Sequence, residues 1–270
     1  MIPCSVPILT LNSEKTLVRC LESVKNFDDI FLVDGNSTDG THDIAKRYGV
    51  PVYKQVETDE PNVTITDFSA VRAAAYKRAQ RDWILILDSD EYISEALKHE
   101  IEQAVMHNDT MTAYAFPYVM LLGNKQIRYS FNMPRADMRL YNKRSGIYLK
   151  EGKTVHEKFY LPETVRVVTF KNDFFNDIQP YRKALKKDAF YLSLSKKKIL
   201  TKKTSLIRGE MMRAVILNFM RAFHILARSI AVYARHGFKE SLPPAHVWRF
   251  MRYHFIISGY RLQQLMGKRI

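Results

Sequence analysis

The sequence contains only two cysteines, Cys4 and Cys20, among its 270 residues. Two thiols at this spacing form neither a zinc-ligand pattern nor a disulfide framework, and a reducing cytoplasm is the simplest setting for them. No glycine-rich G-x-G-x-x-G follows a predicted strand, which argues against a Rossmann dehydrogenase. The first predicted strand begins almost at Met1 with no basic segment before it, so we expect no signal peptide.

Long apolar runs are also missing: no stretch of about 18 uncharged apolar residues occurs, and we expect no membrane-spanning helix. Acidic residues are scarce in one part of the chain only. Residues 1–180 contain 22 Lys and Arg against 25 Asp and Glu, whereas residues 181–270 contain 20 against 3. The net charge of +14 therefore arises in the C-terminal segment. We expect an α/β domain over residues 1–180 and a basic, amphipathic helical extension over residues 181–270.

Two acidic residues, Asp88 and Asp90, directly follow the apolar run at 83–87, a pattern typical of a buried strand in a parallel sheet. Ligands bind at the carboxyl ends of such strands. Two carboxylates this close repel each other unless a cation lies between them, and carboxylate oxygens suit Mg²⁺ or Mn²⁺. The pattern therefore indicates a site for a metal ion and a diphosphate. The structural alternative is a polar turn before a helix that begins near Ser94.

The first hundred residues alternate between predicted strands, at 5–9, 30–33, 50–53 and 83–87, and predicted helices. The helices begin at a cap at Asn12 or Ser13, at Thr41 and at the cap Asp67. This alternation predicts a doubly wound, Rossmann-like α/β sheet that is mostly parallel. Right-handed crossovers bring the loops after the strands to one rim. Five polar residues from distant parts of the chain gather there: Thr10, Asn12, Asp34, Asp88 and Asp90.

Four segments carry a resemblance to a known family: TLNSE at 10–14, VDGNSTDGT at 33–41, FSAVRAAA at 68–75 and LDSDE at 87–91. With these segments in this order, the chain resembles the family 2 glycosyltransferases, which have the nucleotide-diphosphosugar transferase fold called GT-A. The resemblance covers residues 4–95 and extends more loosely to residue 180. Within the family the chain is most similar to β-glucosyltransferases of lipopolysaccharide core assembly, partly through TVHE at 154–157.

The resemblance implies a donor site on the predicted rim. Thr10 and Asn12 would border the nucleoside, with Glu14 beside them, and Asp34 would hydrogen-bond the base. Arg72 would face the diphosphate, a task that suits a planar and permanently charged guanidinium. A UDP-sugar is the expected donor.

The same resemblance implies a divalent cofactor, Mg²⁺ or Mn²⁺, that bridges the two phosphates of the donor. Asp90 would bind the metal, Asp88 would contact the ribose and reach the metal, and His156 would be a further ligand. A divalent cation neutralises the charge that develops on the leaving diphosphate.

Transfer also requires a group that removes the proton of the acceptor hydroxyl, and a carboxylate or histidine can do this. Glu157 is the first candidate for this general base and Asp137 is the second. The alternative interpretation of His156 and Glu157 is a polar pair on the surface of a strand. A single displacement assisted by one base inverts the anomeric carbon, so an α-linked donor would give a β-linked product.

Two positions depart from the family pattern. Many relatives carry two consecutive acidic residues after the second strand, but Gly35 takes the second place here, which affects recognition of the base. A His-Tyr pair that often precedes an aromatic-basic helix in close relatives is replaced by KNDFF at 171–175. The Q-x-x-R-W signature of processive polysaccharide synthases does not occur, so we expect transfer of one sugar rather than polymerisation.

The C-terminal segment combines basic and aromatic residues on predicted helices at 208–236 and 247–266, separated by Pro243 and Pro244. A basic amphipathic helix with aromatic residues is typical of attachment to an anionic membrane surface. The same helices could instead pack on the first domain or form a homo-oligomer. Binding of other polyanions is the third interpretation.

These patterns predict an inverting, metal-dependent hexosyltransferase that acts on a glycan or glycolipid acceptor. We expect it to be cytoplasmic and peripheral at the inner membrane face, in lipopolysaccharide or other cell-surface polysaccharide biosynthesis. A sugar-nucleotide nucleotidyltransferase would share the fold, but its Gly-rich basic loop is missing from PILTLN at 7–12. A polyanion-binding protein is suggested only by the basic segment; no nucleic-acid motif accompanies it, and we expect no nucleic-acid partner.

Overall fold

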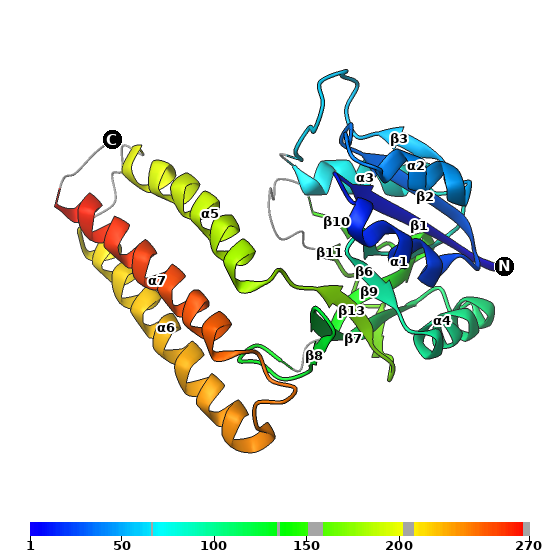
Figure 1. Ribbon diagram of the computed structural model, residues 1–270. Helices are drawn as coiled ribbons and strands as arrows, with labels where there is room; N and C mark the ends of the chain where they lie inside the picture. The colour runs from blue at the N-terminus through cyan, green and yellow to red at the C-terminus, as the bar shows by residue number, and fades with distance from the viewer. Residues whose placement is uncertain (66, 134–135, 151–158, 202–207, 267–270) are drawn as a thin grey trace. The chain divides into compact units, whose positions relative to one another are not determined.

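The computed structural model describes residues 1–65, 67–133, 136–150, 159–201 and 208–266 (Figure 1). The chain divides into two compact units. Unit 1 comprises residues 1–119 and 135–177, and unit 2 comprises residues 120–134 and 178–270. Unit 2 therefore contains more than the C-terminal segment, because it also includes a hairpin formed by the end of β7 (Thr112–Leu122) and β8 (Lys125–Ile127).

A mixed sheet forms the centre of unit 1. The strands β1 (Ile2–Thr10), β2 (Phe27–Asp34) and β3 (Val52–Lys54) are parallel, and β4 (Trp83–Leu85) continues the parallel part beside β1. The next two pairings are antiparallel, because β9 (Ala136–Asn142) runs against both β4 and β7. The predicted α/β fold is confirmed, with the parallel arrangement concentrated in its N-terminal part.

Shorter strands complete the sheets at their margins. They are β5 (Leu87–Asp88) beside β1, β13 (Phe174–Asp177) against β6 (Glu91–Ile93), β12 (Arg166–Thr169) beside β7, and the two-stranded β10 (Tyr148–Leu149) and β11 (Phe159–Tyr160). The run at 83–87 is thus two strands rather than the single strand predicted. Ile86 lies between these two strands, and its N–H donates to the carbonyl of Arg139 over 2.7 Å.

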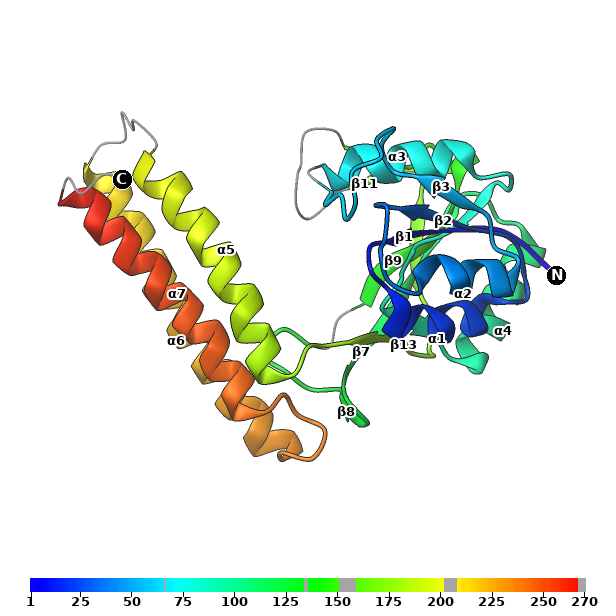
Figure 2. The same ribbon diagram turned by 45° about the horizontal axis from the view of Figure 1, so that its top comes forward.

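Helices cover both faces of the parallel strands (Figure 2). The helix α3 (Phe68–Arg78) lies on one face, while α1 (Glu14–Val24), α2 (Thr41–Tyr48) and α4 (Glu95–His107) lie on the other. Alternate residues of the strands point to opposite faces, so Leu32 packs in the core beneath α1, whereas Phe31 and Val33 pack in the core beneath α3. Two apolar layers result, and they fix the strand ends that carry the polar rim.

Of the predicted helix caps, Asp67 forms a capping hydrogen bond and Ser13 does not. The carboxylate of Asp67 accepts a hydrogen bond from the N–H of Ala70 over 3.1 Å, which caps α3. Ser13 precedes α1, but its side chain makes no capping bond, because its Oγ lies 2.8 Å from Oγ of Ser89. That contact joins the loop after β1 to the loop after β5.

Unit 2 consists mainly of three helices, α5 (Tyr181–Thr201), α6 (Arg208–His236) and α7 (Pro244–Leu265). Helices α6 and α7 lie side by side in both views (Figures 1 and 2). The described buried core of this unit is small and comes from both helices and the β7–β8 hairpin: Ile127, Ala222, Ile225, Leu242, Val247 and Met251. An ion pair of 2.8 Å between Arg249 and the mostly buried Asp188 links α7 to α5.

Candidate functional site

The carboxyl edge of the parallel strands brings three of the predicted site residues together. Thr10 lies opposite Asp34 in the pairing of β1 with β2, and Leu9 lies opposite Asp88 in the pairing of β1 with β5. Because the strands are parallel, the loops that follow them leave the sheet on the same side. Thr10, Asp34 and Asp88 therefore lie on one rim of unit 1.

Asp34 is the most strongly hydrogen-bonded residue on this rim, and it is 2% exposed. Its carboxylate accepts from Thr10 Oγ1 at 2.8 Å, from Ser37 Oγ at 2.6 Å, from the Ser37 N–H at 2.7 Å and from His42 Nε2 at 2.8 Å. Burial raises the pKa of Asp34, but the bonds from Ser37, His42 and Thr10 lower it below its ordinary value. A carboxylate offers about four acceptor positions. A hydrogen bond to a base would therefore require one of these donors to move.

Asn12 and Glu14 lie beside the loop that follows β2. Asn12 is exposed with φ 50°, its amide donates to Asn62 Oδ1 over 2.8 Å, and its Oδ1 accepts from the Thr38 N–H over 3.0 Å. The side chain of Glu14 is exposed, and its backbone N–H donates to Asp39 over 3.0 Å. Together with Thr10 and Asp34 they form a polar surface at the end of β1 and β2.

Gly35, the departure from the family pattern, lies directly against the segment 55–63. Its carbonyl accepts a hydrogen bond of 2.7 Å from the N–H of Val63. A Cβ at position 35 would stand 2.4 Å from the carbonyl oxygen of Val63 and 3.1 Å from Nε2 of Gln55. No side chain fits at that distance from a backbone oxygen. The segment 55–63 therefore occupies the space that a second acidic side chain would need.

We expect Gly35→Asp, which would restore two consecutive acids, to destabilise this protein by about 1–3 kcal/mol, because Val63 must move. Thermal unfolding measures the change. Gly209→Asp is the matched control, since no atom lies within 4 Å of a Cβ built there. Equal melting temperatures for the two variants would contradict the close approach of the two segments.

The loop after β5 concentrates three carboxylates. Glu91 is 3% exposed, accepts the N–H of Asp88 over 2.9 Å, and binds both terminal nitrogens of Arg139 at 2.8 and 2.9 Å. Burial and the charge of Asp88 raise the pKa of Glu91 to about 7 against the opposing charge of Arg139, and Asp90 adds to the rise. Asp90 is half-buried, and its carbonyl accepts the N–H of Asp177 over 3.2 Å. The negative potential here is one that a bound cation would relieve.

The donor set of this loop fits a hard divalent cation. Within the described ranges, no three Asp, Glu, His or Cys side chains form a preassembled metal cluster. Such a cluster is not required, because Mg²⁺ keeps several waters and commonly takes one or two carboxylates together with phosphates of the substrate. Asp88 and Asp90 could supply those carboxylates. His156, the further ligand implied by the resemblance, lies outside the described residues.

A cavity of about 260 Å³ adjoins this loop in unit 1. Its described lining is Arg72, Tyr76, Ile86, Asp88, Asp137, Met138, Arg139 and Phe159. The guanidinium of Arg72 lies 2.5 Å from Oδ1 of Asp88. Burial raises the pKa of Asp88, but the charges of Arg72 and Arg139 lower it below its ordinary value. Two nearly buried cations in one cavity form a site that an incoming diphosphate could occupy in place of the carboxylate of Asp88.

The two candidates for the general base are placed differently. Asp137 lines this cavity, and its Oδ2 lies 3.9 Å from a terminal nitrogen of Arg139. Glu157 lies outside the described residues. Arg139 therefore bridges Glu91, next to the D-x-D pair, and Asp137 on β9.

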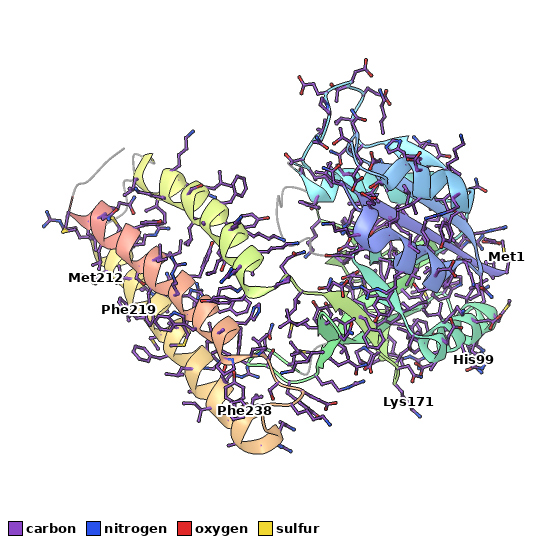
Figure 3. All side chains as sticks on the ribbon, viewed as in Figure 1. Met1, His99, Lys171, Met212, Phe219 and Phe238 are labelled. Carbon is purple, nitrogen blue, oxygen red and sulfur yellow. The ribbon has the colours of Figure 1, made fainter. Side chains whose placement is uncertain are left out.

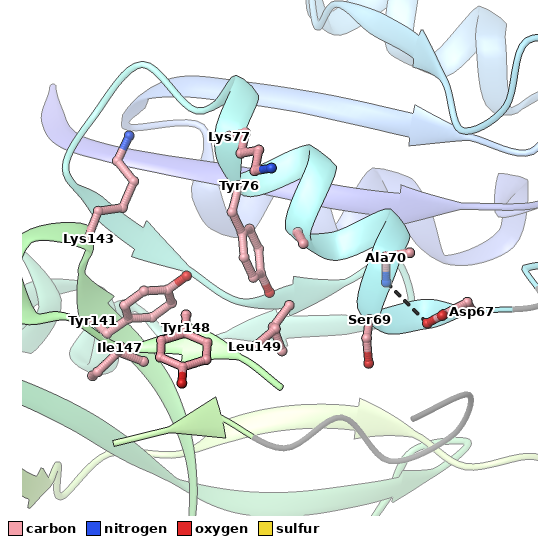
Figure 4. Close-up of a pocket in the computed structure, with 11 residues that line it drawn as sticks. Asp67, Ser69, Ala70, Tyr76, Lys77, Tyr141, Lys143, Ile147, Tyr148 and Leu149 are labelled. Carbon is pink, nitrogen blue, oxygen red and sulfur yellow. Dashed lines mark hydrogen bonds between the residues drawn. The ribbon is translucent and has the colours of Figure 1, made fainter. Parts of the chain in front are cut away.

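A second and larger cavity, of about 750 Å³, lies beside the first, along α3 (Figure 4). Tyr76 lines both cavities, and in Figure 4 it points from α3 toward Tyr141 and Tyr148. The remaining described lining consists of Asp67, Ser69, Ala70, Ala73, Lys77, Lys143, Ile147 and Leu149. This is an aromatic and aliphatic cavity with two lysines, directly beside the cavity that holds Arg72.

Sequence analysis did not identify several of these residues. Glu91 is the last residue of the LDSDE segment, so its place next to the two aspartates could have been recognised from the sequence. Arg139, Tyr141 and Tyr148 belong to no motif, and only the pairing of β9 with β4 brings the first two near the rim.

Residues 5–171 match the sequence profile of the family described as Glycosyl transferase family 2. The chain is 28% identical over 255 residues to an uncharacterized glycosyltransferase of Rickettsia typhi, a match that covers 91% of this chain and 83% of that protein. It is 26% identical over 164 residues to the lipopolysaccharide core biosynthesis glycosyltransferase LpsC of Rhizobium meliloti, over 58% of this chain and 56% of that protein. The crystal structure of S. aureus TarS in complex with UDP is similar at a TM-score of 0.45 and 18% identity, over 98% of this chain and 91% of that chain.

Proposed function

The chain belongs to glycosyltransferase family 2, and from this membership we propose that it transfers one hexose from a UDP-sugar to a glycan or lipid-linked acceptor, with inversion. Use of a nucleotide sugar follows from the family. The main observation in support of the proposed transfer is the cavity at the strand ends. Arg72, Arg139 and Asp88 all line this cavity and lie within the residues that match the family.

In this proposal the donor lies along the rim, with its nucleoside beside Thr10, Asn12, Glu14 and Asp34. Arg72 exchanges its present partner, Asp88, for the diphosphate, to which a planar guanidinium can donate two parallel hydrogen bonds. Asp90 and Asp88 would hold Mg²⁺ or Mn²⁺, which when bound supplies Lewis-acid neutralisation of the leaving group. Arg139, held by Glu91, adds a second fixed positive charge to the cavity.

Either Glu157 or Asp137 accepts the proton of the attacking hydroxyl in this proposal. We assign the acceptor to the larger cavity, because it adjoins the donor cavity through Tyr76. Tyrosine rings offer flat apolar faces together with hydroxyl groups, which suits the faces and edges of a sugar ring. Lys77 and Lys143 would favour an acceptor that carries an acidic group.

We further propose that the enzyme acts at the cytoplasmic face of the inner membrane, in lipopolysaccharide or other cell-surface polysaccharide biosynthesis. The similarity to LpsC, a lipopolysaccharide core biosynthesis glycosyltransferase, supports the pathway. The balance of 20 basic against 3 acidic residues in 181–270 supports attachment to an anionic surface.

Thermal unfolding with a panel of nucleotide sugars tests the donor assignment. At a ligand concentration about 100 times Kd, we expect stabilisation by about 2.7 kcal/mol from one UDP-sugar, in Mn²⁺ or Mg²⁺ and not in EDTA. GDP- and dTDP-sugars serve as controls for the base. Equal stabilisation by all three nucleotides would contradict the choice of uridine, and stabilisation by none would contradict the donor site.

A further inference from the structure

Helix α6 buries only one of its faces. Val215, Ala222, Ile225 and Ser229 are buried, at spacings of three, four and seven residues that define a single stripe. Ala222 and Ile225 belong to the core that unit 2 forms with α7. Packing within unit 2 therefore accounts for the burial of this stripe.

A second apolar stripe on α6 is uncovered. Seven large apolar side chains, here called the outer stripe, are between 37% and 61% exposed: Met212, Ile216, Phe219, Met220, Phe223, Leu226 and Ile230. Their spacing of three and four residues places them on one side of the helix. Figure 3 shows Met212 and Phe219 among the side chains that project outward from α6. Contiguous apolar surface of this kind marks a site of interaction with a partner or a membrane.

The outer stripe continues onto α7 through aromatic rings. The ring of Phe255 on α7 lies 5.5 Å from that of Phe219 and 6.3 Å from that of Phe223, between centroids. Trp248, about two helical turns before Phe255 and 52% exposed, lies 6.3 Å from the same ring. Aromatic rings with a polar edge are favoured at membrane–water interfaces.

Arginines occupy a third side of α6, apart from both apolar stripes. Arg221, Arg228 and Arg235 are exposed and recur every seven residues, so they share one side of α6. The buried residues Ala222 and Ser229 each follow one of these arginines by one position. At 3.6 residues per turn, consecutive residues point in different directions, so the arginine side of α6 is not the buried side. A helix with an exposed apolar stripe and a separate arginine side matches a helix that lies in the plane of an anionic membrane surface.

The charge of the segment favours a bilayer over a second copy of the chain. A dimer formed through the outer stripe would bring together two segments that each carry 20 basic and 3 acidic residues. Anionic headgroups complement the same charge. By length and composition alone α6 is able to cross a membrane, contrary to the expectation from the sequence. Lying flat is favoured over crossing, because the buried stripe is bound to α7, where Ser258 donates to the carbonyl of Val215 over 3.3 Å.

We propose that the outer stripe of α6, extended by Trp248 and Phe255, inserts into the surface of an anionic lipid bilayer while the buried stripe stays packed on α7. The proposal specifies the surface behind the membrane attachment given above and rests on that part of the proposed function. Long arginine side chains can reach headgroup phosphates while the apolar stripe enters the acyl boundary.

Co-sedimentation of the full-length protein with vesicles tests this surface without any nucleotide. We expect binding to vesicles of equal parts phosphatidylcholine and phosphatidylglycerol, and weaker binding to phosphatidylcholine alone. Met220→Gln should weaken binding about 10-fold, and Met220→Gln combined with Phe223→Gln about 100-fold. High salt should weaken binding without removing it, because the apolar contribution is not screened.

Met106→Gln on α4 is the matched control, because Met106 and Met220 are both 61% exposed. It should leave vesicle binding unchanged. Binding to neither vesicle, or an equal loss in Met106→Gln and Met220→Gln, would overturn the proposal. So would light scattering that shows a dimer dissociated by the double variant, or protein that resists alkaline extraction from native membranes. Donor-dependent thermal stabilisation, measured on the same samples, reports on the glycosyltransferase site separately.

Discussion

Asp90→Ala should reduce sugar transfer by at least about 1000-fold, because it removes the carboxylate we assign to the metal that stabilises the leaving diphosphate. Metal-dependent donor binding should be lost with it. The fold should remain intact, since Asp90 is half-buried at a strand end and its truncation opens no core cavity. Asp88→Ala should weaken donor binding less completely.

Initial rates with saturating Mn²⁺, together with thermal unfolding, measure both parts of this expectation. Glu95→Ala is a suitable control, because Glu95 is an acidic residue of the same region whose side chain is 81% exposed. It should leave the rate unchanged. Near-normal turnover by Asp90→Ala would exclude Asp90 from the metal site.

Glu157→Gln should lower kcat by a factor on the order of 10²–10⁴ while donor binding persists, if Glu157 is the general base. The amide keeps the size of the side chain but cannot accept the proton. Asp137→Asn provides the comparison, because Asp137 lines the cavity that contains Arg72 and Asp88.

The two variants give opposite patterns for the two assignments. Loss of kcat in Glu157→Gln alone assigns the base to Glu157, and loss in Asp137→Asn alone assigns it to Asp137. The KM for the donor should stay within about threefold of wild type in the variant of the base, since the proton transfer does not affect ground-state binding. Full activity in both variants would contradict a carboxylate base at either position.

Local sequence signals predicted those elements whose causes are local. Helix α2 begins at Thr41 and ends at Gly49, which adopts φ 65° and donates its N–H to the carbonyls of Ala45 and Lys46. Helix α6 follows an uninterrupted stretch without proline and has the bounds expected from it. Capping, chain reversal and apolar periodicity act within a few residues, so they can be recognised without knowing the rest of the fold.

Features that depend on distant partners could not be predicted. Ser13 precedes α1 as a cap residue would, but its hydroxyl contacts Ser89 instead, 76 positions away. The run at 83–87 divides into β4 and β5, which both pair with the distant strand β1. The strand β9 enters the sheet antiparallel to both of its neighbours, β4 and β7, and no short-range pattern records that choice.

The candidate site shows the same division. The rim residues could be predicted, since each directly follows an apolar strand. Gly35 contacts Val63, 28 residues away, and Glu91 forms an ion pair with Arg139, 48 residues away. Both contacts appear only in the folded chain. The apolar periodicity of α6 can be recognised in the sequence. The packing of α7 decides which of the two apolar stripes of α6 is buried, and the sequence does not show that packing.

Release of UDP from a UDP-hexose by the purified full-length protein tests the central claim most directly. We predict slow hydrolysis of the donor that requires Mn²⁺ or Mg²⁺, stops in EDTA and is lost in Asp90→Ala, and that accelerates when a lipid-linked glycan acceptor is added. UDP release at the same rate in EDTA and in Asp90→Ala would contradict a metal-dependent transferase. No release or binding of any nucleotide sugar, with either metal, would contradict the glycosyltransferase function itself.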